Sequence, residues 1–131
     1  MDVMKVLDKM EKEEGFFKHN NYHVVEATEE SIILKAELTE NSMNPYNMVH
    51  GGLIFGLGDT VMGMVAAAAS SKIAVTMNAD ISYLIPGDGK YLIAKGNLIR
   101  KGKTTCVVSA NIYNDKEKLI AVMTSTYFFI E

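Results

Sequence analysis

Apart from the phenol of Tyr46, His50 and Asp59 are the only ionisable side chains between residues 40 and 72, and the stretch around them is mostly apolar and rich in glycine. A helix that begins at Gly51-Gly52 points its first backbone N–H groups outward, at the positive end of the helix dipole. Since glycine has no side chain, a ligand oxygen can reach these groups, as in a backbone oxyanion hole. Asp59 adds a carboxylate, which is costly on an apolar helix unless it is paired or functional. The combination predicts a catalytic site in preference to a plain helix start.

The sequence argues against several other chemistries. It holds no Gly-x-Ser-x-Gly motif for a serine nucleophile, and the glycine spacing of Gly58–Gly63 lacks the Lys and Ser/Thr of a phosphate loop. His19 and His23 precede or enter a predicted strand without an evident third ligand, so we expect surface histidines and no metal site. Cys106 lies mid-strand on an apolar face, which predicts a core residue.

Composition limits the class of protein. The 131 residues suit a single domain, with 48% hydrophobic and 22% charged residues. A formal net charge of −3 argues against nucleic acid as a partner. One cysteine excludes a scaffold built on internal disulfides and favours a reducing compartment, so we expect a cytoplasmic protein. The charged residues of the first 14 positions rule out a signal peptide there.

Hydrophobic periodicity predicts the elements that must position the site. An amphipathic helix over 2–14 places Val3, Val6, Leu7 and Met10 on one face. A long helix runs from Gly51 or Gly52 to Ala69, after a loop over 39–49. About six strands are predicted, joined in consecutive hairpins as one antiparallel sheet: 22–28, 31–38, 74–84, 91–100, 104–113 and 119–130. The fold class is α+β.

The segment 49–71 is nearly long and apolar enough to span a membrane. Asp59 in its middle and five interrupting glycines argue against insertion, so we expect no membrane partner. A helix that is apolar on all sides is otherwise buried inside its own protein. Its glycines at 51, 52, 56, 58 and 63 make it slim, which lets a sheet or a second chain approach closely.

The pattern Asn44…His50-Gly51-Gly52…Asp59 resembles the hotdog-fold acyl-CoA thioesterases of the phenylacetic-acid-degradation (PaaI-like) group. The strings 80–86 and 101–104 also match that group, and the similarity covers roughly residues 15 to 130. The resemblance implies a curved antiparallel sheet wrapped around one long central helix, with a short helix before it. It also implies a homodimer paired edge to edge, and often a homotetramer.

The resemblance also implies a role for each matching residue. Asp59 would be the general base or the nucleophile that attacks the thioester carbonyl, and the Gly51 N–H would polarise that carbonyl. Asn44 would help to place water or substrate, His50 would hydrogen-bond the thioester region, and the hydroxyl of Thr76 would assist the water.

Coenzyme A would enter as part of the substrate, with no separate cofactor. The family contacts it at positions that correspond here to Gly52, Tyr83, Pro86, Gly87, Arg100, Lys101, Gly102, Lys103 and Thr104. The cations at the predicted hairpin tip suit a nucleotide phosphate, although an ordinary solvated turn has the same composition.

Two other functions are compatible with the same fold. A hydratase or dehydratase would need a His and a carboxylate at one carbon, but His50 and Asp59 are about 13 Å apart along a helix. A non-catalytic acyl-CoA-binding protein would normally carry a further effector segment.

The rise of a helix puts Asp59 about 12 Å from Gly51, which is too far for both to act on one carbonyl group. We therefore expect the active site to be shared between two chains.

Overall fold

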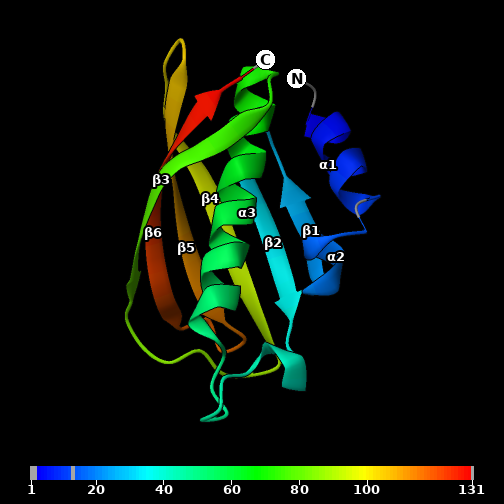
Figure 1. Ribbon diagram of the computed structural model, residues 1–131, viewed down its shortest axis with the longest axis vertical. Helices are drawn as coiled ribbons and strands as arrows, with labels where there is room; N and C mark the ends of the chain where they lie inside the picture. The colour runs from blue at the N-terminus through cyan, green and yellow to red at the C-terminus, as the bar shows by residue number, and fades with distance from the viewer. Residues whose placement is uncertain (1–2, 13, 131) are drawn as a thin grey trace.

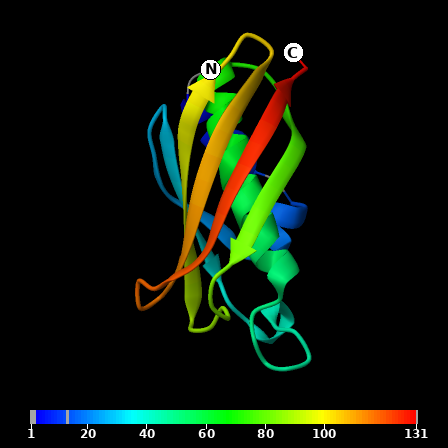
Figure 2. The same ribbon diagram turned by 90° about the vertical axis from the view of Figure 1, so that its left-hand side faces the viewer.

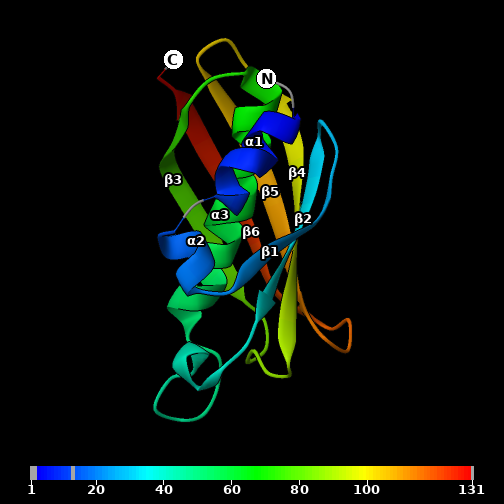
Figure 3. The ribbon, with the colours of Figure 1, turned by 90° about the vertical axis from the view of Figure 1, so that its right-hand side faces the viewer.

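The computed structural model describes residues 3–12 and 14–130, and it consists of one curved antiparallel sheet around one long helix (Figures 1 and 2). Two short helices cover the other side of the long helix (Figure 3). The predicted fold class is confirmed, including the short N-terminal helix.

The helices and strands lie close to their predicted positions. The helices are α1 (Val3–Glu11), α2 (Phe16–His19) and α3 (Gly51–Ser70), with a 3₁₀ turn η1 at Glu40–Ser42. The strands are β1 (Tyr22–Ala27), β2 (Ser31–Glu37), β3 (Ala74–Tyr83), β4 (Tyr91–Lys101), β5 (Thr105–Asn114) and β6 (Leu119–Phe129). Neither α2, which contains His19, nor η1 was predicted. Of the predicted helix 2–14, positions 2 and 13 lie outside the described residues.

Helix α3 is the core of the fold. The sheet packs on one side of it and α1 and α2 on the other, so it is apolar all round without facing a membrane (Figures 1 and 3). It is long and apolar enough to span a bilayer by composition, yet half of its 20 residues are buried within the described chain. The helix begins after His50 and ends at Ser71, which has a left-handed backbone.

The order of strands in the sheet is β1-β2-β4-β5-β6-β3. The expectation of consecutive hairpins is wrong for β3, which pairs with β6 and not with β4. Helix α3 carries the chain across the sheet, so β3 starts at the far edge. Figure 2 shows β3 at one edge and the β1–β2 hairpin at the other.

Two glycines allow the sheet and α3 to approach closely: Gly58, one of the helix glycines for which this was predicted, and Gly96 on β4, which was not predicted. A Cβ atom at Gly58 would lie 2.0 Å from the sulfur of Met123 on β6. One at Gly96 on β4 would lie 3.2 Å from both methyl carbons of Val61 on α3. The short separation brings the side chains of β3 and β6 within reach of Asp59.

Candidate active site

Two hydroxyl groups hold the half-buried carboxylate of Asp59 on α3. Thr76 Oγ1 donates to Asp59 Oδ1 at 2.9 Å. The Tyr127 O–H lies 2.5 Å from the same Oδ1 and 2.7 Å from the Asp59 carbonyl oxygen. Both donors act on one carboxylate oxygen, which leaves Oδ2 for a proton or a substrate.

The sheet places these two hydroxyls side by side. Thr76 on β3 and Tyr127 on β6 are direct cross-strand partners, and a β-bulge follows Thr76 before Asn78. Such bulges re-aim side chains next to functional sites. Burial, followed by the hydrogen bond and the charge of Asp59, raises the pKa of Tyr127. Its hydroxyl therefore stays protonated and remains a donor.

A cavity of about 520 Å³ opens beside Asp59. Thr76 and Tyr127 lie in its wall next to the carboxylate, and most of the remaining wall is apolar. The apolar part comes from α1, from the C-terminal half of α3 and from the start of β3: Val6, Met10, Gly63, Met64, Ala67, Ile73, Ala74 and Val75. A carboxylate at the edge of an apolar cavity suits a reaction on a ligand with a hydrocarbon part.

At the start of α3, one backbone N–H is left without a partner in the described chain. His50 Nδ1 accepts from the Gly52 N–H at 2.8 Å, so the His50 side chain caps the helix. The N–H groups of Leu53 and Ile54 donate to the His50 carbonyl at 3.0 and 3.3 Å. Only the N–H of Gly51 is free to polarise a ligand oxygen, whereas that of Gly52 is already used.

Gly51 lines a second cavity, of about 310 Å³, together with Asn44 and the segment 83–87. Asn44 Oδ1 accepts from the N–H groups of Tyr46 and Met48 at 2.9 and 3.1 Å, so this side chain fixes its own loop. The Asn44 amide nitrogen is the part of the side chain left for a ligand or water.

Three residues of the predicted coenzyme A contacts lie at this second cavity: Tyr83, Pro86 and Gly87. The Tyr83 O–H donates to the Gly51 carbonyl at 2.7 Å, and burial raises the pKa of that phenol. The Gly87 carbonyl accepts from the Val49 N–H at 3.1 Å and so joins the two loops. These hydrogen bonds link the loops that form the cavity to the start of α3.

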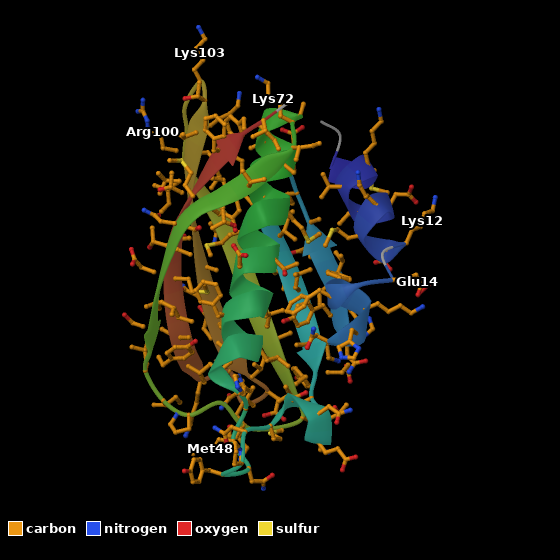
Figure 4. The ribbon with its side chains drawn as sticks, in the orientation of Figure 1. Lys12, Glu14, Met48, Lys72, Arg100 and Lys103 are labelled. Carbon is orange, nitrogen blue, oxygen red and sulfur yellow. The ribbon has the colours of Figure 1, made fainter. Side chains whose placement is uncertain are left out.

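The hairpin tip between β4 and β5 lies at the opposite end of the molecule from Gly51. Figure 4 shows Arg100 and Lys103 at that end, near Lys72, and Met48 of the second cavity at the other. The two groups of residues predicted to bind coenzyme A are therefore not brought together within one chain. Asp59 and Gly51 are likewise separate: they line different cavities, about 12 Å apart along α3.

Tyr127 is the functional residue that the sequence reasoning missed. Its signal was a tyrosine in an alternating strand, at an inward-facing position where a buried hydroxyl needs a partner. Cys106, by contrast, is buried as expected, and burial raises the pKa of its thiol.

Comparison with known proteins shows several relatives. The family model described as "Thioesterase superfamily" matches residues 46–121, more than half of the chain. The acyl-coenzyme A thioesterase PaaI of Escherichia coli is 28% identical over 100 residues, which cover 76% of this chain and 71% of PaaI.

Solved structures show the same fold. The E. coli PaaI structure superposes with a TM-score of 0.92 at 22% identity, covering 98% of this chain and 94% of PaaI. A Streptococcus mutans protein, solved bound to acetyl CoA, superposes with a TM-score of 0.82 at 29% identity. That match covers 91% of this chain and 96% of the other.

Proposed function

Because the chain belongs to the thioesterase superfamily, and is therefore a thioester hydrolase, we propose that it hydrolyses acyl- or aryl-coenzyme A to the free acid and coenzyme A. The PaaI relative is named an acyl-coenzyme A thioesterase, and the S. mutans protein binds acetyl CoA. The observation that carries the proposal is the Asp59 carboxylate, held through Oδ1 at the edge of an apolar cavity.

In the proposed reaction, the Gly51 N–H donates to the thioester carbonyl oxygen and stabilises the negative charge that develops there. Asp59 Oδ2 takes a proton from water, and the resulting hydroxide attacks the carbonyl carbon. The carbon–sulfur bond then breaks, and the proton passes from Asp59 to the leaving thiolate. Direct attack by Oδ2, with an anhydride hydrolysed afterwards, is the alternative path.

We propose that Gly51 and Asp59 of one site come from different chains. A carbonyl held at Gly51 must have its attacker within about 3–3.5 Å, whereas Asp59 of the same helix is about 12 Å away. Strand β3 supports pairing because it ends the sheet and exposes the apolar side chains of Val75 and Met77. Two β3 strands that pair about a two-fold axis would run antiparallel, which brings the start of one α3 toward the middle of the other.

The same dimer gives the hairpin tip a role. Two-fold pairing along β3 moves the tip of one chain, with Arg100, Lys101 and Lys103, toward the Tyr83–Gly87 loop of its partner. Both groups can then contact one coenzyme A. A homotetramer and a cytoplasmic location stay predictions from the resemblance and the composition.

The test measures thiol release from acyl-CoA by the wild type and by Asp59→Asn. The asparagine side chain keeps a carbonyl oxygen that can accept from Thr76 and Tyr127, but it cannot take a proton. We expect hydrolysis to fall by at least about 10²-fold with acyl-CoA binding largely kept. Asp8→Asn, on the exposed face of α1, is the matched control. Near-normal turnover by Asp59→Asn would remove Asp59 from the mechanism.

A further inference from the structure

The cavity beside Asp59 has lysines in its wall. Lys5 and Lys9 on α1 and Lys72 after α3 line it, and Asp59 is the one carboxylate in that lining. The formal charge of the lining is therefore positive, although the whole chain carries −3. Figure 3 shows α1 lying over the C-terminal half of α3, and the exposed Lys5 and Lys9 belong to the part of the cavity wall that α1 supplies.

The two lysines of α1 differ from the other lysines near it. Lys12 pairs with Asp8 at 3.1 Å, and Lys18 pairs with Glu14 at 2.8 Å. Lys5 and Lys9 form no ion pair within the described chain. They lie one helical turn apart, where like charges destabilise a helix slightly. An anion bound between them would offset that repulsion.

The length of the cavity indicates where such an anion would sit. From Asp59 to Ala67 the wall follows α3 for about 12 Å. An extended chain advances roughly 1.3 Å per carbon–carbon bond, so the seven bonds of an eight-carbon acyl chain cover about 9 Å of this distance, and the long lysine side chains can reach across the rest. An anion beside the lysines would then belong to a ligand whose middle part is hydrocarbon.

We propose that this cavity takes acyl groups that end in a carboxylate, with Lys5 and Lys9 binding the terminal carboxylate. The inference rests on the proposed function, since it assumes that the reacting carbonyl lies at Asp59. The Tyr83–Gly87 pocket with Gly51 receives the coenzyme A arm, which leaves the Asp59 cavity for the acyl arm.

The experiment compares octanoyl-CoA with octanedioyl-CoA, which differ only in the terminal carboxylate. For the wild type, we expect a higher kcat/KM with octanedioyl-CoA, and this preference should shrink as salt is added. Lys5→Gln/Lys9→Gln should lower the octanedioyl-to-octanoyl ratio of kcat/KM about fivefold or more. Lys12→Gln on the same helix, ion-paired with Asp8, is the matched control and should keep the wild-type ratio.

A second set of substrates tests whether the lysines bind the acyl carboxylate or the phosphates of coenzyme A. N-acetylcysteamine esters of the same two acids have no phosphate, and the double variant should lower their ratio as well. If the double variant lowered kcat/KM equally for both CoA esters and for neither N-acetylcysteamine ester, the lysines would bind phosphate, and the proposal would be overturned. An unchanged ratio in the double variant would overturn it too.

A binding measurement tests this inference independently of the proposed hydrolysis. Calorimetry with the free products octanedioate and octanoate needs no turnover. We expect the wild type to bind octanedioate more tightly, and the double variant to lose that difference. If the wild type hydrolyses no thioester, the proposed function fails, and calorimetry still decides whether the lysines bind the carboxylate. Equal binding of both acids by the wild type would overturn the inference even where hydrolysis is found.

Discussion

Asp59 is held by one of its two carboxylate oxygens. Thr76 and Tyr127 both donate to Oδ1, so the carboxylate has a fixed orientation and Oδ2 is the oxygen that the proposed mechanism uses. Tyr127 is buried and Thr76 is exposed, so the tyrosine is the better anchor. We infer that Tyr127 is a positioning residue that acts through Asp59.

Tyr127→Phe tests this role. We expect kcat/KM to fall about tenfold, and the free energy of unfolding to fall by about 1–2 kcal/mol, because a buried hydrogen bond is lost. Because the lost hydrogen bond orients Asp59 for the reaction, kcat should fall more than KM changes. Tyr113→Phe, on β5 beside Lys95, is the control. A lower stability with unchanged kcat and KM would leave Tyr127 a purely structural residue.

At the scale of elements, the close contact between α3 and the sheet depends on small residues. A Cβ atom at Gly58 would overlap the sulfur of Met123. A Cβ atom at Gly63 would lie 3.4 Å from the ring of Tyr127, which is an ordinary contact. Both glycines lie within the helix, where alanine is favoured by up to about 1 kcal/mol. Packing therefore decides whether each glycine-to-alanine substitution raises or lowers the free energy of unfolding.

The two glycine-to-alanine variants should have opposite effects. Gly63→Ala should raise the free energy of unfolding by up to about 1 kcal/mol, because it gains helix propensity without a clash. Gly58→Ala should lower it by about 1–3 kcal/mol, because Met123 must move within a packed core. Urea unfolding of both variants measures the difference. Equal stabilisation by both would mean that Met123 yields freely.

The sequence predicted the positions of the helices and strands better than it predicted which strands pair. Helix α3 and the alternation of β5 follow from local patterns, so their bounds were nearly right. The pairing of β3 with β6 joins segments far apart in the chain, and local periodicity carries no information on it. Tyr127 was missed for the same reason, since its role depends on the cross-strand neighbour Thr76 and on a bulge. Gly51 and Asp59 could be proposed from the sequence because they lie on one helix, where local patterns are informative.

At the scale of the whole molecule, one chain carries its two groups of candidate site residues in separate places. The free Gly51 N–H and the Asp59 carboxylate line separate cavities. In the proposed dimer, each site combines Gly51 of one chain with Asp59 of the other.

Mixing two inactive variants tests this arrangement. Asp59→Asn lacks the carboxylate, and Gly51→Val places a side chain against Tyr83, where even a Cβ would lie 3.3 Å from the phenol oxygen. After unfolding and refolding together, half of the dimers should be heterodimers with one working site of two, so about a quarter of the wild-type activity should return. No recovery, with heterodimers confirmed by mass spectrometry, would place both residues in one chain's site.

The unpaired edge of β3 also has a consequence for the single chain, before it forms the proposed dimer. A newly folded single chain carries a sheet edge with unsatisfied backbone groups and exposed Val75 and Met77. Any other extended chain can hydrogen-bond to such an edge, so the lone subunit is the species most prone to aggregate. Mass action favours the proposed dimer, in which this edge is covered, only above a certain concentration. Expression level would govern not only how much enzyme a cell holds, but also what fraction of it survives to work.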